Sequence, residues 1–195
     1  MTAIAGIQFK GSKDTVRTML NKMAHRGNSW RHVVEHDNVI LGVSGTKAQY
    51  LGADRLLQDN VAQEMISSSH FARARVANGS LELTRDPLGV SPLYYGRTSN
   101  GSLCFASEVK GLLEATTDVH ELPPGHKLRG LIIAPLSGKT KRTTINGTLE
   151  QVSRDLRQRL ETAILDRIGD GNVGAWLSGG IDSAVTAAIA ARALA

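Results

Sequence analysis

Six consecutive residues have the side chains and the backbone freedom that suit a phosphate-binding turn. Ser178-Gly179-Gly180-Ile181-Asp182-Ser183 follows the apolar run 173–177, whose length is typical of a buried strand. An alanine-rich segment comes next, and either Asp182 or Ser183 is a suitable N-cap for a helix there. A strand, a glycine turn and a helix N-terminus would direct free backbone N–H groups and the positive end of a helix dipole at one anion.

Side chains of the same six residues add to this chemistry. Ser178 and Ser183 supply hydroxyl donors, and the carboxylate of Asp182 could orient either a Mg²⁺ ion or the loop itself. The hexapeptide resembles the pyrophosphate loop of the N-type ATP pyrophosphatases, which cleave ATP between its α- and β-phosphates. The resemblance implies that Ser178, Gly179, Gly180, Asp182 and Ser183 bind pyrophosphate, with Mg²⁺ at Asp182. The alternative is an ordinary strand–helix turn that binds no ligand.

A second group of candidate residues lies near the start of the chain. Removal of Met1 would leave Thr2 with a free α-amine, and an N-terminal threonine can act as a nucleophile with its own amine as base. The alternative is an ordinary start residue, which a single feature does not exclude. His25 ends a predicted helix, where a histidine either takes part in chemistry or interacts with the helix dipole.

The elements that must position these residues fall into two groups. Up to about residue 135 the pattern is rich in strands, and Asn78-Gly79 and Asn100-Gly101 favour β-hairpins. The expected strands are 4–9, 33–34, 39–43, 70–77, 81–84, 93–96, 103–106 and one through 131–133, and the expected helices are 13–23, 53–58 and 108–113. Residues 136–147 are predicted to be a linker between domains 1–135 and 148–195. A helix at 148–168, with a capping box, then leads to the phosphate-binding turn.

Composition indicates a folded protein of one or two domains. The 195 residues are 41% hydrophobic and 21% charged, which provides for a core and argues against disorder. Only 4% are aromatic, which argues against single-stranded nucleic acid as a partner. The single cysteine, Cys104, excludes an intramolecular disulfide and fits a reducing compartment. With no apolar stretch of membrane-spanning length and no secretory leader, we expect a cytoplasmic protein without a membrane partner.

Together the motifs resemble those of glutamine-dependent asparagine synthetase, which joins a class II glutamine amidotransferase domain to a pyrophosphate-loop synthetase domain. The matching segments follow the family's order along almost the whole chain: 4–7, 25–27, 85–95, 105–110, 122–126 and 177–183. The resemblance implies an α+β fold, with a four-layer α/β/β/α N-terminal-nucleophile sandwich for residues 1–135. It also implies that residues 148–195 are the first α-β-α of an α/β adenine-nucleotide hydrolase-like domain, which is incomplete here.

Departures from the family pattern gather in the amidotransferase part. Thr2 stands where the family has a cysteine nucleophile, and a hydroxyl has a far higher pKa than a thiol. The family also has an Asn-Gly pair for its oxyanion hole and an arginine upstream of it. We identify neither feature between His36 and His70, and that stretch looks too short for both. Residues 67–70 are Ser-Ser-Ser-His, where the family has an aspartate that binds the glutamine amine. We therefore expect no hydrolysis of glutamine.

Two functions follow as expectations. The first is an ATP-dependent, amide-forming protein like asparagine synthetase, in which a carboxylate substrate and ATP give an acyl-adenylate and pyrophosphate, with ATP and Mg²⁺ as cofactors. The alternative is a non-catalytic pseudo-amidotransferase module that binds a partner or a nucleotide. The net charge of +5 and the basic stretch 126–142 favour a polyanion only weakly. The sequence leaves the oligomeric state open, and a homo-oligomer is compatible with it.

Overall fold

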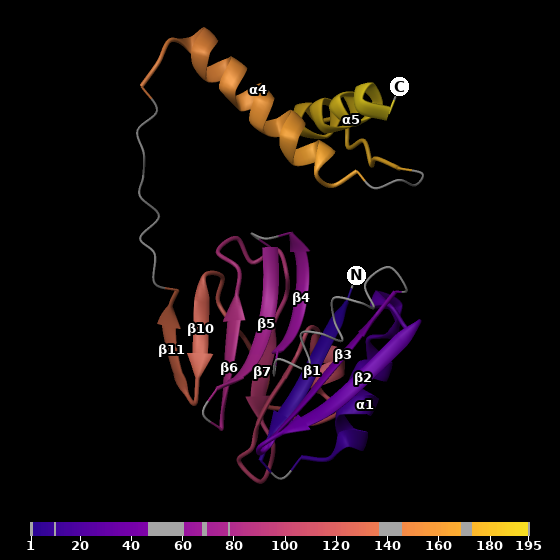
Figure 1. The fold of residues 1–195 in the computed structure, drawn as a ribbon, viewed down its shortest axis with the longest axis vertical. Coiled ribbons are helices and arrows are strands. Elements are labelled where there is room, and N and C mark those ends of the chain that lie inside the picture. Colours follow the sequence, from indigo (N-terminus) through magenta and orange to yellow (C-terminus); the bar gives the residue numbers. More distant parts are fainter. Residues whose placement is uncertain are drawn as a thin grey trace. The chain divides into compact units, whose positions relative to one another are not determined.

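The structure is a computed structural model of the 195-residue chain (Figure 1). It describes residues 2–9, 11–46, 61–67, 70–77, 79–136, 146–168 and 173–194, with 61–67 described by their backbone alone. The chain forms two compact units, Met1–Gly138 and Lys139–Ala195. The predicted helix at 53–58 and most of the predicted linker 136–147 lie outside the described residues.

The first unit contains a six-stranded antiparallel sheet in the order β2-β3-β1-β8-β7-β9. Its strands are β1 (Ala3–Gln8), β2 (Trp30–His36), β3 (Val39–Gly45), β7 (Tyr94–Arg97), β8 (Leu103–Ala106) and β9 (His120–Glu121). At Gly6, in the middle of the sheet, a Cβ would lie 2.5 Å from both the Ile40 carbonyl oxygen and the Phe105 ring. Only a residue without a side chain therefore lets the strands approach each other there.

A second antiparallel sheet in this unit has five strands in the order β11-β10-β6-β5-β4. Its strands are β4 (Val61–Ser67), β5 (His70–Ala77), β6 (Ser80–Arg85), β10 (His126–Arg129) and β11 (Ile132–Pro135). The prediction of a single strand through 131–133 is wrong, because two strands lie in this region. The chain reverses at Gly130, and β10 pairs with β11. Gly130 has a φ of +61°, a left-handed conformation that glycine adopts at low cost.

Two helices of the first unit match predicted ones. Helix α1 (Lys13–Lys22) begins after Ser12, whose hydroxyl accepts a hydrogen bond from the Thr15 amide at 3.0 Å. A 3-10 turn, η1 (Ala24–Arg26), follows it and ends at Gly27, whose φ is +135°. Helix α3 (Val109–Leu112) lies within the predicted range 108–113.

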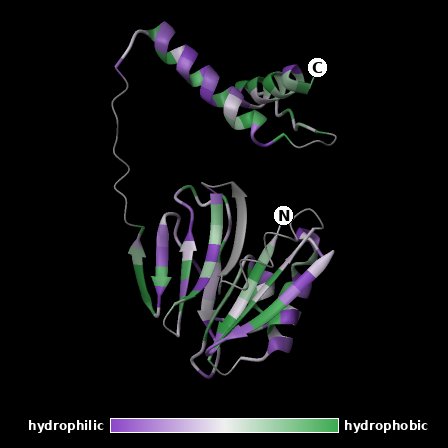
Figure 2. Ribbon diagram, in the orientation of Figure 1, coloured by the Kyte–Doolittle hydropathy of each residue, from purple (hydrophilic) through white to green (hydrophobic). Residues whose placement is uncertain are grey.

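Two hydrophobic clusters hold the layers of the first unit together. One lies between the sheets, where Ile4 and Phe105 of the first sheet meet Leu83 of the second. The other joins the opposite face of the six-stranded sheet to α1 and α3 through residues such as Met19 and Leu112. Figure 2 shows mostly hydrophobic residues along β1 and β3, as two covered faces require. The described residues thus form helix, sheet and sheet layers, and the predicted α+β sandwich is confirmed.

The second unit contains two helices, α4 (Leu149–Leu165) and α5 (Ile181–Leu194), which contact each other. The predicted capping box of α4 is confirmed. The Gln151 amide donates to the Thr148 hydroxyl at 3.3 Å, and the Thr148 amide donates to the Gln151 side chain at 2.9 Å. Local signals therefore define where α4 begins, although no residue of α4 is buried.

Candidate functional sites

The serine–glycine loop, residues 178–183, leads directly into α5. Gly179 has a φ of +84°, and a Cβ there would meet nothing within 4 Å. The Gly180 carbonyl accepts a hydrogen bond from the Ala184 amide at 3.1 Å, so Gly180 is the residue that caps the helix. The prediction of Asp182 or Ser183 as N-cap is therefore wrong. Both residues lie in the first turn, because the glycines let the chain enter the helix earlier.

The hydroxyl groups of Ser178 and Ser183 lie 3.0 Å apart and form the centre of this loop. The Ser178 amide donates to the Ser183 hydroxyl at 3.2 Å, and that hydroxyl donates to the Gly180 carbonyl at 3.0 Å. Among the described residues, none accepts a hydrogen bond from the backbone N–H of Ile181 or Asp182. Two hydroxyls and unpaired first-turn amides thus lie together at the positive end of a helix dipole.

Solvent reaches the loop and the segment before it. Residues 173–177, predicted to be a buried strand, form no strand, and Trp176 and Leu177 are 98% and 66% exposed. No strand of the described chain pairs with this segment, so its backbone lacks ladder partners and its apolar side chains lack a covering layer. Residues 178–182 are exposed as well, which leaves the loop open to a phosphate from solution.

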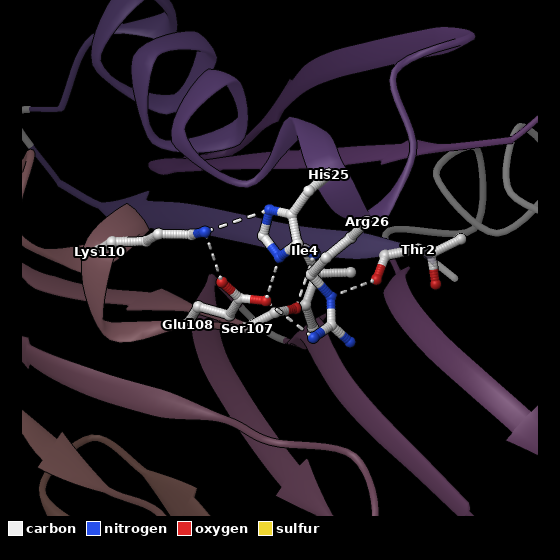
Figure 3. A network of polar contacts seen from close by, with 7 residues as sticks. All are labelled: Thr2, Ile4, His25, Arg26, Ser107, Glu108 and Lys110. Carbon is white, nitrogen blue, oxygen red and sulfur yellow. Dashed lines mark hydrogen bonds and ion pairs between the residues drawn. The ribbon is translucent and has the colours of Figure 1, made fainter. Parts of the chain in front are cut away.

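Thr2 belongs to a second, amino-terminal cluster with His25, Arg26, Glu108 and Lys110 (Figure 3). Thr2 is buried, and its carbonyl oxygen accepts a hydrogen bond from Arg26 Nε at 3.1 Å. Arg26 is itself buried, and its Nη1 donates to Glu108 Oε1 at 3.0 Å. The cluster therefore fixes the backbone of Thr2, whereas the role of its hydroxyl as a nucleophile stays a prediction.

Glu108 connects the cations of this cluster (Figure 3). His25 Nε2 lies 2.9 Å from Glu108 Oε1, and Lys110 Nζ lies 3.4 Å from Oε2 and 3.2 Å from His25 Nδ1. Partial burial raises the pKa of Glu108, but the hydrogen bonds and charges of Arg26 and His25 hold that pKa below its ordinary value. Sequence reasoning singled out His25 but missed Glu108. The available signal was the family-like segment 105–110, which contains Glu108.

The loop that most resembles the family, residues 85–95, uses its charged side chains to hold backbone. Arg85 is buried and donates to the carbonyl oxygens of Ser91, Leu122 and Gly89 at 2.8–2.9 Å. Asp86, also buried, accepts hydrogen bonds from the amides of Leu88, Val90 and Ser91. These contacts make the Arg-Asp pair a structural element of the sandwich.

Two further properties concern ligands and membranes. Within the described part of the chain, no three His, Cys, Asp or Glu side chains are grouped so as to hold a metal ion. A Mg²⁺ ion at Asp182 would therefore take its other ligands from phosphate oxygens and water, which is how Mg²⁺ commonly binds with nucleotides. No helix in the described ranges is both long enough and apolar enough to cross a bilayer.

Two protein-family models match successive parts of the chain. Residues 61–148 match a glutamine amidotransferase domain, and residues 155–195 match asparagine synthase. These matches support the asparagine synthetase family, with a glutamine amidotransferase part that precedes a synthase part. Both units are therefore represented in the match, in the order that the sequence motifs imply.

Relatives of this asparagine synthetase-like chain include glutamine-hydrolysing enzymes of several eukaryotes. It is 34% identical over 124 residues to a probable asparagine synthetase of Dictyostelium discoideum, a match to 55% of this chain and 21% of that protein. Asparagine synthetase of Asparagus officinalis is 34% identical over 133 residues, covering 64% of this chain and 22% of its own length. Asparagine synthetase 2 of Oryza sativa subsp. japonica is 37% identical over 120 residues, covering 57% and 19%. The chain thus spans about a fifth of the length of these relatives.

Solved structures support the fold. Glutamine phosphoribosylpyrophosphate amidotransferase from B. subtilis, complexed with ADP and GMP, matches with a TM-score of 0.54 and 12% identity. The match covers 98% of this chain and 64% of that one. An allosteric regulatory enzyme of purine biosynthesis matches with a TM-score of 0.54 and 13% identity, over 97% and 63% of the two chains. At such identities the likeness concerns the fold alone, and it agrees with an N-terminal-nucleophile sandwich.

Proposed function

We propose that the chain is part of an ATP-dependent, amide-forming protein like asparagine synthetase, whose serine–glycine loop binds the pyrophosphate of ATP. The observation that carries the proposal is the pair of hydroxyls, Ser178 and Ser183, 3.0 Å apart beside unpaired amides at the start of α5. That arrangement suits pyrophosphate, whose several oxygens can each accept a hydrogen bond. The chain would act together with the larger part of the synthetase that its relatives contain.

Each residue of the loop has a role in this proposal. Gly179 and Gly180 let the phosphate approach the backbone, because neither has a Cβ. The amides of Ile181 and Asp182 donate hydrogen bonds to phosphate oxygens. The two serine hydroxyls do so once their protons turn from each other and from the Gly180 carbonyl toward the ligand. When a carboxylate attacks the α-phosphorus of ATP to form an acyl-adenylate, negative charge develops on the departing pyrophosphate, and these preorganised donors stabilise it. Bound Mg²⁺ would neutralise part of that charge, with Asp182 as its protein ligand.

Binding of pyrophosphate to the 195-residue chain tests this role directly. Isothermal titration with Mg²⁺ present is expected to show binding, and Ser178→Ala or Ser183→Ala should weaken it about tenfold, as expected for one charge-assisted hydrogen bond. Ser153→Ala, at an exposed position of α4, is the matched control and should bind like the unmodified chain. Absence of binding, or equal binding by all three variants, would contradict the proposal.

We further propose that the first unit does not hydrolyse glutamine. Thr2 supplies a weak hydroxyl nucleophile in place of a thiol. Gly79, of the Asn-Gly pair that precedes the family loop, has a φ of +68° in the turn between β5 and β6, so this glycine serves a hairpin. An amidotransferase that lacks its glutaminase would use free ammonia or an amine of the substrate itself.

Ammonia release from glutamine is the corresponding assay. The unmodified chain and Thr2→Ala should both release none above background. Thr2→Cys should also stay inactive, because a thiol alone does not restore the oxyanion donors or the group that binds the glutamine amine. Ammonia release that is lost in Thr2→Ala would overturn this part of the proposal while leaving the pyrophosphate site untouched.

A non-catalytic module is the second candidate function. The observation in its favour is the exposed segment 173–177, which has no neighbouring strands in the described chain to complete an α/β sheet. A module of this kind would still bind pyrophosphate or a nucleotide. Exchange of label between pyrophosphate and ATP that depends on an added carboxylate separates the two, when the chain is assayed together with the remaining part of the synthetase, because only a synthetase catalyses it.

A further inference from the structure

A small cavity of about 160 Å³ lies in the first unit, where the end of the six-stranded sheet meets the turn between β10 and β11. Tyr95 and Arg97 of β7, Asp118 and His120 on the way into β9, and Leu128 and Leu131 near the turn line it. None of these residues belongs to the serine–glycine loop or to the amino-terminal cluster. The cavity is therefore separate from both candidate sites.

One wall of the cavity is aromatic and firmly held. The rings of Tyr95 and His120 stack with their centroids 5.4 Å apart and their planes at 28°. His120 Nε2 forms a hydrogen bond with Asp118 Oδ1 at 2.7 Å. The other oxygen of Asp118 accepts the Arg97 amide at 2.9 Å. The backbone and side-chain hydrogen bonds of Asp118 thus fix the stacked pair.

Two charged groups line the cavity, the Asp118 carboxylate and the Arg97 guanidinium, and they differ in how many hydrogen-bond partners they have. Both oxygens of Asp118 already accept hydrogen bonds, from the Arg97 amide and from His120. These bonds, with smaller effects of the His120 and Arg97 charges, lower the pKa of Asp118. In the described chain, no acceptor lies within hydrogen-bond or ion-pair distance of the Arg97 guanidinium. The Arg97 guanidinium therefore has N–H donors that no acceptor in the described ranges takes, in a planar arrangement that matches a carboxylate.

The remaining wall is apolar. Leu128 is almost fully buried, whereas Leu131 is 62% exposed and lies at the edge of the cavity. An exposed leucine beside a stacked aromatic pair is an apolar surface that the aliphatic part of a small ligand could cover. A volume of about 160 Å³ lies below the roughly 300–1,000 Å³ that is typical of ligand pockets. It is too small for most drug-sized ligands and suits a molecule with few non-hydrogen atoms.

We propose that this cavity binds a small monocarboxylate with a compact apolar body, whose carboxylate pairs with Arg97 and whose body lies between the Tyr95–His120 stack and Leu131. Isovalerate is a suitable probe, because it combines one carboxylate with a branched aliphatic body. The proposal is independent of pyrophosphate binding and of glutamine hydrolysis.

Titration of isovalerate into the ¹⁵N-labelled 195-residue chain, followed by NMR, tests the site. Amide signals of Tyr95, His120 and Leu131 are expected to shift together in a saturable way. Arg97→Gln keeps the backbone N–H that binds Asp118, so the wall is preserved, and affinity should fall about tenfold. Arg129→Gln removes the same charge from an exposed position of β10 outside the cavity, and it should bind as the unmodified chain does.

A second ligand tests the charge without any mutation. Isovaleramide has the same shape as isovalerate but no charge, and it should bind about tenfold more weakly. Equal affinities for the two ligands, equal losses in Arg97→Gln and Arg129→Gln, or shifts that avoid the cavity would each overturn the proposal. Absence of saturable shifts in the unmodified chain would do the same.

Discussion

Arg26 and Glu108 form a 3.0 Å ion pair between the turn after α1 and the residue before α3. The arginine is buried, and this carboxylate and the backbone carbonyl of Thr2 are among the groups that compensate its charge. The pair joins the start of the chain to a segment that follows β8. We infer that it keeps the amino-terminal backbone in place whether or not Thr2 reacts.

Replacement of Glu108 should destabilise the first unit in a pH-dependent way. Because the pKa of Glu108 is held below its ordinary 4.5, its stabilising effect is fully present above that pH and is lost as the pH falls through the lower folded-state pKa. Glu108→Gln should therefore lower the free energy of unfolding by about 2 kcal/mol at pH 7, mainly by removing the negative charge beside buried Arg26, and by less in acid.

Denaturant unfolding of the first unit at several pH values measures this difference. Glu35→Gln is a suitable control, because Glu35 makes only an exposed 3.4 Å ion pair with Lys13 and should change stability little. A Glu108→Gln effect that is the same at acidic and neutral pH would show that the ion pair is not its source.

The thiol of Cys104 should be unreactive in the folded chain. Desolvation by burial, with a smaller effect of the Asp118 charge, raises the pKa of Cys104 to about 12, and the thiol donates to the Gly96 carbonyl. Since only the thiolate is alkylated, iodoacetamide at pH 8 should modify the native chain far more slowly than the unfolded chain. Asp118→Asn should leave the protection in place, because burial is its larger cause. Rapid alkylation under native conditions would contradict the buried position of this thiol.

Arg85→Lys should weaken the first unit although it keeps the charge. A lysine ammonium cannot reproduce the guanidinium contacts with the carbonyls of Ser91, Gly89 and Leu122. We expect a loss of about 2–4 kcal/mol, because the buried hydrogen bonds to the Ser91 and Leu122 carbonyls are lost together. Thermal unfolding measures the loss, with Arg17→Lys on α1, where the arginine pairs with exposed Asp14, as a nearly neutral control.

Local signals in the sequence were sufficient for much of the fold. Ser12, Gly27 and the apolar spacing of α1 mark that helix, and Thr148 with Gln151 marks the start of α4. The two Asn-Gly pairs predict the hairpins that became β5–β6 and β7–β8. Each of these features depends on residues close together in sequence, which is why pattern reasoning finds them.

Features that depend on distant residues were not predictable in the same way. The contacts of Glu108 with His25 and Arg26 span more than 80 residues, and β9 is only two residues long. The segment 173–177 has the composition of a buried strand, but burial needs partners that the described chain does not place beside it. In the candidate loop the residue types were found, whereas the pairing of the Ser178 and Ser183 hydroxyls required three-dimensional coordinates.

The placement of the two tryptophans gives each unit its own optical reporter. Trp30 lies against the core between the sheets and donates to the Thr46 carbonyl at 2.6 Å, so its emission should shift to longer wavelength when the first unit unfolds. Trp176 is already surrounded by water and lies two residues before Ser178. Its fluorescence should not change when the first unit unfolds, but it should change when a ligand binds at residues 178–183. Binding to the loop can therefore be followed without a label.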